Sequence, residues 1–323
     1  MLSKILKEHI PIDVAKMRAG NFMQSQIDNE KKKLDKIKAG SGWQDIKACP
    51  LCHRTESTFV LEKHGCPLVQ CLHCELWYHT RTPANLDDVY KDDEYEIFTT
   101  AETKAHFQYK MERFGRERVA LLETVCGSLS GKKILEVGCG NGYVLAAAKE
   151  KSSQCYGSEF SKKNIAKAIH NTGLPIYPDP LESFPQKDFD IIMSFDVLEH
   201  VEHPVNFVQS ISNLLKPGGY ILFYTPNYDS FSVKLLKEYS SYVDPTEHII
   251  LFNSGSLQAI AERTDLEVVY MVTRGLDISN IIAYYAYLSQ TENTFLTTNV
   301  NDLQAMVDHS GSADSMRVIY RKK

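Results

Sequence analysis

The sequence predicts an α/β fold built around a mostly parallel β-sheet. Short apolar runs at 134–138, 154–158 and 175–177 are typical of β-strands, and helical patterns begin at Tyr143 and span 161–171 between them. Regular alternation of strands and helices indicates a sheet whose two faces are covered by helices. Ligands of such domains bind beyond the carboxyl ends of the strands, so we expect functional residues in the loops that follow the strands.

The glycine-rich turn after the first of these strands is the strongest local feature. In the stretch ILEVGCGNGYVL (134–145), the apolar run ends at Val137 and is followed by Gly138, Gly140 and Gly142. Because glycine has no Cβ atom, such a turn can adopt otherwise strained dihedrals and let a nucleoside lie against the main chain. The G-x-G-x-G spacing differs from the G-x-G-x-x-G of dinucleotide sites, and no Lys-Ser/Thr pair follows to hold a triphosphate, which disfavours NAD and ATP.

A carboxylate, Glu159, follows the second predicted strand. An acid at that place can bind the 2′- and 3′-hydroxyls of a ribose, as in the mononucleotide-binding halves of doubly wound sheets. The turn and the acid together therefore favour a nucleoside-containing ligand.

At this point the chain resembles the class I S-adenosylmethionine-dependent methyltransferases. The match rests on Glu136, the three glycines and Glu159, and three stretches extend it: FDIIMSFDVLEHV (189–201), LLKPGGYILFYTPN (214–227) and EHIILFNSGSL (247–257). It covers about residues 110–275. The resemblance implies a Rossmann-like, seven-stranded core and S-adenosylmethionine as the cofactor. The cofactor-binding residues that we expect are Glu136, Gly138, Gly140, Gly142, Glu159, Asp179 and Asp196.

Further polar residues follow the third and fourth predicted strands. Asp179 comes after the strand near 175–177 and is a candidate for binding the adenine amine, although Pro-Asp-Pro is also a common turn composition. The fourth strand, FDIIMSF, is followed by Asp196, Glu199 and His200 at the same edge of the sheet. This run also resembles that of quinone-type O-methyltransferases, so a hard divalent cation held by these three side chains is an alternative.

The rest of the core continues the alternation. Pro204 suits the first turn of a helix that we expect to continue through Leu215 and to stop at the following Pro-Gly-Gly. The fifth strand is YILFYTPN, and further strands are expected near 266–273 and 316–321. The apolar segment IIAYYAYL between them predicts a buried helix, and the alternatives are that it lines the pocket or a homodimer interface.

Two C-x-x-C pairs precede the core. Cys49 and Cys52 are separated from Cys71 and Cys74 by eighteen residues, a spacing typical of a four-thiolate zinc site. The intervening STFVLEK and PLVQ segments predict the hairpin of a zinc ribbon, which is too small to fold without its metal. The duplicated pair disfavours a redox dithiol, and the lack of a secretory signal disfavours a disulfide framework. We therefore expect a closed, structural Zn²⁺ site.

The predicted organisation has four parts. They are a helical segment (1–47), the zinc ribbon (48–80), a helical linker or lid (81–130) and the methyltransferase domain (131–323). Tyr90 and Tyr95 are candidates to fold over the cofactor. Residues 228–253 have the composition of a substrate cap, and such insertions choose the acceptor.

Charge and composition narrow the partners and the compartment. Residues 1–47 carry ten Lys or Arg against six acids, including Lys31, Lys32 and Lys33. We interpret this run as a solvated helix face, with a nucleic-acid-binding arm as the alternative. The net charge of −5 makes a large nucleic-acid footprint unfavourable. No apolar run has the length of a membrane span and no secretory signal is present, so we expect a cytoplasmic protein.

The chemistry implied by the resemblance is in-line transfer of an activated methyl group. It requires alignment of the acceptor and, where the acceptor has a proton to lose, a base. His200 and His248 are the candidate bases because imidazole titrates near neutral pH. Glu199 and Glu247 would be less basic unless they were desolvated.

We expect the acceptor to be a small molecule. A methyltransferase with an N-terminal zinc ribbon resembles bacterial enzymes of sugar-nucleotide and surface-polysaccharide modification, including deoxysugar C-methyltransferases, although the present chain ends sooner after the core than the latter do. A nucleotide sugar or surface-glycan precursor is therefore the first hypothesis. The alternative is an RNA methyltransferase that binds RNA through the ribbon and Lys31 to Lys33. A third hypothesis, a zinc scaffold with an inactive core, is disfavoured by the intact cofactor motif.

Overall fold

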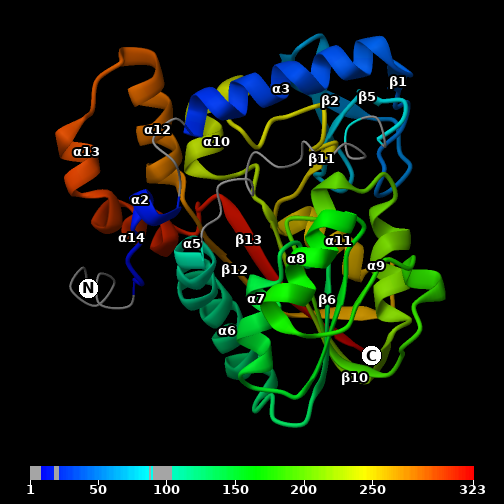
Figure 1. Ribbon diagram of the computed structural model, residues 1–323. Coiled ribbons are helices and arrows are strands. Elements are labelled where there is room, and N and C mark those ends of the chain that lie inside the picture. The colour runs from blue at the N-terminus through cyan, green and yellow to red at the C-terminus, as the bar shows by residue number, and fades with distance from the viewer. Residues whose placement is uncertain (1–8, 18–21, 87–88, 90–103) are drawn as a thin grey trace. The chain divides into compact units, whose positions relative to one another are not determined.

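The computed structural model describes residues 9–17, 22–86, 89 and 104–323 (Figure 1). The chain forms two compact units. Unit 1 comprises Met1–Asp92, Thr225–Ser256 and Val272–Met316, and unit 2 comprises Asp93–Tyr224, Leu257–Met271 and Arg317–Lys323. Neither unit is continuous in sequence. None of the helices in the described residues is long and apolar enough to cross a bilayer. Tyr90 and Tyr95, the expected lid residues, lie outside the described residues.

One seven-stranded sheet lies mostly in unit 2, with its strands in the order β12-β13-β10-β9-β6-β7-β8. In chain order the strands are β6 (Lys133–Val137), β7 (Gln154–Ser158), β8 (Ile176–Tyr177), β9 (Phe189–Phe195), β10 (Leu215–Pro226), β12 (Leu266–Arg274) and β13 (Ser315–Lys322). The pairs from β10 to β8 are all parallel. This confirms the predicted α/β, Rossmann-like class and its seven strands. Because β6 is flanked by β7 on one side and β9 on the other, the strand order reverses there, and ligands of such sheets bind at this point.

Helices connect these strands as the alternation predicts. They are α7 (Tyr143–Lys149), α8 (Lys162–Thr172), η3 (Leu181–Ser183), η4 (Leu198–His200), α9 (Pro204–Ser212) and α11 (Ser254–Ala261). Before the sheet, α5 (Lys104–Lys110), the π-helical turn η2 (Met111–Gly115) and α6 (Arg116–Cys126) follow one another directly. At Gly115 a Cβ atom would lie 2.9 Å from the Tyr143 carbonyl oxygen, so this glycine lets the π-turn pack closely on the start of α7.

The end of α9 differs from the prediction. The helix ends at Ser212 rather than continuing through Leu215, because Leu215 already pairs with Phe189 as the first residue of β10. The Pro-Gly-Gly sequence lies within that strand, where the register shifts between Leu215 and Tyr220 and Gly218 has a φ of +74°. The turn signal thus marks an irregularity inside a strand and not the gap between a helix and a strand.

Unit 1 contains a four-stranded antiparallel sheet in the order β11-β4-β3-β2. Its strands are β2 (Ser57–Lys63), β3 (Cys66–Cys71), β4 (Trp77–His79) and β11 (Ile250–Leu251), and a separate pair joins β1 (Trp43–Asp45) to β5 (Arg81–Pro83). The predicted hairpin is confirmed as β2 and β3. The strand β11 comes from the segment expected to be a cap, so this segment and the ribbon share one sheet.

The ribbon packs on this same segment through side chains as well. Tyr228 stacks on Trp77 with ring centroids 4.1 Å apart, and its hydroxyl donates to the Glu75 carbonyl at 2.7 Å. Leu68 of β3 and Val243 belong to the same buried cluster. Residues about 150 positions away in the sequence therefore supply apolar contacts that a ribbon of this size lacks.

The helices of unit 1 are α2 (Val14–Met17), α3 (Phe22–Ala39), α10 (Phe231–Leu236), η5 (Lys237–Tyr239), α12 (Asp277–Ser289), α13 (Thr294–Thr298) and α14 (Val300–Ser310). The described part of the predicted helical segment (1–47) contains α2 and α3 and ends with the strand β1, and residues 1–8 and 18–21 lie outside the described residues. The apolar segment IIAYYAYL is helical, as predicted, in α12. The prediction that it is buried is wrong, because the buried residues of α12 are Asp277 to Asn280, which precede the segment, and Tyr285 and Leu288 are 42% and 63% exposed.

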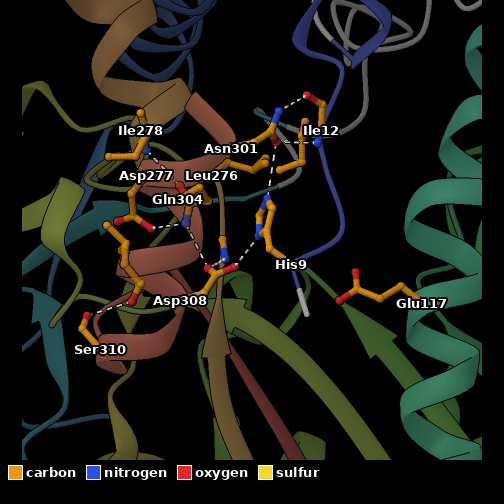
Figure 2. A network of polar contacts seen from close by, with 12 residues as sticks. His9, Ile12, Glu117, Leu276, Asp277, Ile278, Asn301, Gln304, Asp308 and Ser310 are labelled. Carbon is orange, nitrogen blue, oxygen red and sulfur yellow. Dashed lines mark hydrogen bonds and ion pairs between the residues drawn. The ribbon is translucent and has the colours of Figure 1, made fainter. Parts of the chain in front are cut away.

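Polar contacts fix the segment before α2 to α14 (Figure 2). The Asn301 side chain accepts a hydrogen bond from the Ile12 amide at 2.7 Å and donates to the Ile12 carbonyl at 3.3 Å. The His9 ring lies 3.4 Å from the Asp308 carboxylate, and Gln304 donates to Asp277 at the start of α12. Because Asn301 forms hydrogen bonds with both backbone groups of Ile12, this segment has a defined position on α14.

The interpretation of the lysine run as a solvated face is wrong for one of its members. Lys31 and Lys32 are exposed, but Lys33 is 6% exposed, and its ammonium lies 2.6 Å from the Glu247 carboxylate. In α3 the buried residues are Lys33 and Ile37, four residues apart and hence on one face of the helix. This face packs inward, so Lys33 is an internal ion-pair partner within unit 1.

Candidate functional site

The glycine turn after β6 forms the base of the candidate cofactor site. Gly138 and Gly142 have φ angles of +71° and +85°, and added Cβ atoms would lie 2.5 Å from Val197 and 2.9 Å from Thr172. Both glycines are therefore required by left-handed backbone and by close packing. Gly140 has a φ of +52°, but a Cβ atom there would meet open space, so its backbone borders a void.

That void is a cavity of about 280 Å³ within unit 2, at the carboxyl ends of β6 and β9. Its lining combines the loop backbone with charged and aromatic side chains from several elements. The lining residues are Lys110, Arg118, Glu136, Gly138, Cys139, Gly140, Asn141, Tyr143, Asn164, Phe195 and Asp196. A concave site with a few convergent polar groups at a topological switch point has the features of a small-molecule site.

Glu136 brings a buried carboxyl group to this cavity. It is 3% exposed, and its Oε2 atom has no hydrogen-bond partner among the described residues. Burial raises the pKa of Glu136 to about 8, while the nearby Arg118 guanidinium opposes the rise. A buried carboxyl group with an unsatisfied oxygen fits a ligand that carries a hydrogen-bond donor or a positive charge.

Arg118, on α6, is the basic counterpart of Glu136. Its guanidinium lies 4.4 Å from the Phe195 ring centroid and 4.8 Å from that of Tyr224, and it donates to the Tyr143 hydroxyl. A carboxylate oxygen of Asp196 lies 3.8 Å away. Aromatic faces hold the cation without neutralising it, so Arg118 retains the capacity to pair with an anionic group of a ligand.

Two predicted residues lie at the ends of β7 and β9. The Glu159 carboxylate accepts hydrogen bonds from the Gly140 amide at 2.8 Å and from the Ser161 amide at 2.9 Å, so it braces the glycine turn. Asp196 has a φ of +55°, which is unfavourable for a residue other than glycine, and such strain clusters at ligand sites. Its side chain is 60% exposed, which leaves the carboxylate accessible to a ligand.

Only some of the predicted residues of unit 2 line this cavity. Glu136, Gly138, Gly140 and Asp196 line the cavity, whereas Gly142, Glu159 and Asp179 are not among its lining residues. His200 lies on η4, with its ring 3.9 Å from the Glu199 carboxylate, which is 1% exposed. Among the described residues, Asp196 does not join Glu199 and His200 in any cluster of converging ligand atoms.

Sequence reasoning missed Arg118, Tyr143 and Phe195. Arg118 precedes the glycine motif, on a helix with no motif of its own. The available signal was its spacing from Leu122, since residues four apart lie on one helix face and Leu122 is fully buried. An arginine on the apolar face of a helix must meet an anion or an aromatic ring, and here it meets both.

In unit 1 the four predicted cysteines form one cluster. Cys49 and Cys74 have sulfur atoms 3.4 Å apart, as have Cys52 and Cys71, and the four atoms all lie within 4.8 Å of one another. Tetrahedral zinc with Zn–S bonds of about 2.3 Å requires sulfur atoms about 3.8 Å apart, which this arrangement fits. All four cysteines are free thiols. The cluster therefore suggests a structural zinc site.

The electrostatics of the cluster agree with a cationic ligand. A hydrogen bond from Cys74 lowers the pKa of Cys49 to about 5, whereas burial raises the pKa of Cys52 to about 11. Four thiolates cannot coexist at this separation without a counter-charge. A divalent cation bound here would supply that charge and favour the thiolate form of all four.

His248, also in unit 1, belongs to a turn rich in charged side chains. Its Nδ1 atom lies 3.0 Å from the Tyr242 carbonyl oxygen, and its amide donates to the Asp244 carbonyl at 2.8 Å. Asp244 is 7% exposed. Although burial alone would raise its pKa, the Lys33 and Lys63 ammonium groups hold the pKa of Asp244 below its usual value.

Comparison with known proteins identifies the class. Residues 107–271 match the family model described as "Methyltransferase domain", so the chain belongs to this methyltransferase family. The protein is accordingly an S-adenosylmethionine-dependent methyltransferase, as the resemblance implied.

Individual relatives are small-molecule enzymes. The chain is 27% identical over 202 residues to a ubiquinone biosynthesis O-methyltransferase of Bordetella bronchiseptica, covering 55% of this chain and 79% of the relative. It is 29% identical over 158 residues to an enzyme of the same name from Proteus mirabilis, covering 46% and 64%. A crystal structure of magnesium protoporphyrin IX methyltransferase from Synechocystis PCC 6803 shares 14% identity at a TM-score of 0.47, covering 71% of this chain and 93% of that one.

Proposed function

We propose that this chain transfers a methyl group from S-adenosylmethionine to a small hydroxylated acceptor, a nucleotide sugar or a surface-glycan precursor. The observation that carries the cofactor part is the cavity of unit 2, where a buried carboxyl group and a buried guanidinium line the same void as the glycine turn. An amino-acid moiety carries both an ammonium and a carboxylate, and Glu136 and Arg118 are complementary to that pair.

Different residues would bind different parts of the cofactor. Glu136 would accept from the ammonium, Arg118 would pair with the carboxylate, and the backbone at Gly138 and Gly140 would lie against the nucleoside. Glu159 and Asp179 are the candidates for the ribose hydroxyls and the adenine amine, respectively. When bound, the cofactor supplies a methyl group on a positively charged sulfur, which leaves as a neutral thioether.

The protein must then align the acceptor and accept its proton. His200 and His248 are the two candidate bases, and each would take the proton that the acceptor loses as the new bond to the methyl carbon forms. Alignment supplies most of the rate, because in-line attack needs close and collinear atoms.

The acceptor class has a specific support and a specific rival. A sugar-linked acceptor is supported by the pairing of a four-cysteine cluster with a methyltransferase core, which resembles bacterial enzymes of sugar-nucleotide and surface-polysaccharide modification. A phenolic acceptor is the second candidate, since the relatives named above act in ubiquinone biosynthesis. The RNA alternative loses part of its support, because Lys33 is buried and paired with Glu247.

The test combines cofactor binding with an acceptor screen. Calorimetry with S-adenosylmethionine should give one binding event per chain, and Glu136→Gln should weaken it. A labelled-methyl assay should then incorporate label into a nucleotide sugar and not into catechols or RNA. Label in a catechol alone would move the proposal to the phenolic class, and absence of cofactor binding would overturn it.

A further inference from the structure

We infer that Lys33, in the N-terminal helix α3, is a positioning residue that fixes the turn 242–248 and thereby the ring of His248. The inference rests on the proposed function, in which His248 is a candidate base, and it adds a helix outside the matched family segment to the acceptor-binding machinery. The helix α3 contains no catalytic motif, so the positioning role of Lys33 is inferred from its contacts alone.

Lys33 is placed at the centre of a buried charge cluster. Its ammonium lies 2.6 Å from Glu247 and 3.8 Å from Asp244, and the exposed fractions of the three side chains are 8%, 15% and 10%. Burying an ammonium group with two carboxylates has a desolvation cost that well-packed apolar side chains would avoid. Such a cluster therefore contributes little net stability, and its value lies in the geometry that it imposes.

The geometry in question is that of a tight turn organised by Asp244. Its carboxylate accepts the Thr246 amide at 2.9 Å, and its carbonyl accepts the amides of Glu247 at 3.3 Å and His248 at 2.8 Å. Lys33 thus pairs with the residue that shapes the turn and with the residue that precedes the histidine. Ion pairs at both positions add to the backbone hydrogen bonds that hold the turn.

A second lysine attaches the same turn to the zinc-cluster sheet. Lys63, the last residue of β2, donates to the Val243 carbonyl at 2.8 Å and forms an ion pair with Glu30 of α3 at 2.7 Å. The helix therefore contacts the turn directly through Lys33 and indirectly through Glu30 and Lys63. The turn is held from two elements of unit 1.

The result for His248 is a defined ring orientation. Its Nδ1 atom lies 3.0 Å from the Tyr242 carbonyl oxygen, which can only accept, so Nδ1 carries the hydrogen. In the neutral ring the lone pair is then on Nε2, the atom that would take a proton if His248 is the base. Tyr242 and His248 belong to the turn that Lys33 holds, so movement of this turn would break the contact that selects the tautomer.

The experiment measures this tautomer in the full-length protein. ¹⁵N-histidine-labelled protein is recorded by NMR over a series of pH values, the tautomer is read from the spectra of the neutral ring, and His248→Gln assigns the signal. We expect the wild-type protein to show the Nδ1–H form. Lys33→Met should shift the signal toward an average of the two tautomers, whereas Lys33→Arg should keep the wild-type pattern. The matched control is Lys31→Met, an exposed lysine on the same helix, which should change nothing.

Enzyme assays provide the second measurement. With an accepted substrate, Lys33→Met should lower kcat by about 10- to 100-fold, the size expected when a reacting group is misplaced, without changing the KM for S-adenosylmethionine. A failed acceptor screen would count against the proposed function alone, because the NMR signal requires no acceptor. A folded Lys33→Met protein with the wild-type tautomer would overturn the inference.

Lys33→Met removes the cation between two buried carboxylates and can prevent folding, so a second variant covers that case. Lys33→Gln combined with Glu247→Gln removes one charge of each sign and leaves two amide side chains in place of the ion pair. We expect this protein to fold and to show averaged His248 tautomers. The wild-type tautomer in this double variant would equally overturn the inference.

Discussion

The two sites of this chain are built in opposite ways. The cysteine cluster of unit 1 uses four side chains of one kind from two C-x-x-C knuckles, and all of them lie between residues 49 and 74. The cavity of unit 2 uses unlike groups that the sheet and helices bring together, such as Arg118 of α6, Glu136 of β6 and Asp196 after β9. One site is local in sequence, and the other exists only after the domain has folded.

This difference indicates what each ligand does for the protein. In the cluster, close thiols need a cation before they can all ionise, so the ligand contributes to folding itself. In the cavity, the fold already carries the cost of burying Glu136 and Arg118, and aromatic rings and neighbouring charges keep these groups in place. We therefore expect metal loss to act on stability, and changes in the cavity to act on affinity.

The largest effect should follow loss of the metal. Zinc contributes about 10–16 kcal/mol to folding in small four-ligand sites, which is as large as the net stability of a typical domain. Cys71→Ser, or treatment of the wild-type protein with a strong chelator, should therefore remove about one zinc ion per chain and unfold the sheet of unit 1. Elemental analysis measures the metal, and limited proteolysis with thermal scanning measures the loss of structure.

Cys66 provides the matched control for this prediction. It lies on β3, the strand that Cys71 ends, and is 1% exposed, but it is outside the cluster. Cys66→Ala should keep the zinc and lose only the stability expected from one small buried side chain. A purified wild-type protein without metal, stable to the chelator, would break the contrast between the two sites.

A smaller effect is expected from Arg118→Met. A hydrogen bond to a charged group contributes about 1.5–3 kcal/mol, so S-adenosylmethionine should bind about 10- to 150-fold more weakly. The zinc content should not change, because Arg118 lies in unit 2. Calorimetry measures the affinity.

Arg116→Met tests whether that loss is specific. Arg116 lies two residues earlier on the same helix, and it pairs with Glu150 at the surface with half of its side chain exposed. Exposed ion pairs contribute little, so this variant should bind the cofactor as the wild-type protein does. Equal affinities for the Arg116 and Arg118 variants would mean that the buried guanidinium does not bind the ligand.

The same contrast explains which features could be predicted from the sequence. The cysteine spacing and the glycine turn are local patterns, so the thiol cluster, the first strand and the α/β class could be predicted without the structure. Arg118 could not be found from a motif, because its role depends on packing against strands that come later in the chain. The two-residue strand β11 is too short to carry a signal, and it exists because β4 offers a pairing edge.

Lys33 shows how a composition argument can fail where a periodicity argument would have succeeded. A run of three lysines favours a solvated face, and Lys31 and Lys32 are exposed. Helical spacing, however, places Lys33 on the same face as Ile37, which is 1% exposed. The partners of this lysine, Asp244 and Glu247, lie more than 200 residues away in the sequence, and no local pattern could name them.

The smallest effect concerns a proton on Glu136. It tests whether this carboxyl group is neutral in the free protein, so that it does not balance the charge of Arg118 before the ligand binds. Burial raises the pKa of this carboxyl group to about 8, so below that pH the free protein holds a proton there. A positively charged ligand favours the carboxylate, so binding near pH 7 should release up to one proton per chain, and the release should disappear above pH 8. Glu136→Gln should abolish it. Calorimetry in two buffers of different ionisation enthalpy measures the number of protons.

Stability should follow the sign of the same shift. A carboxyl group whose pKa is higher in the folded than in the unfolded state stabilises the folded protein at low pH, and this contribution is lost as the pH rises from about 4.5 through 8. Relative to Glu136→Gln, the ligand-free wild-type protein should therefore lose stability over that range, as measured by denaturant titration at several pH values. Identical binding heats in both buffers, together with parallel stability curves, would show that Glu136 is already ionised in the free protein. The Glu136 carboxylate would then already balance the charge of Arg118 before the ligand binds, and the contrast with the thiol cluster would be lost.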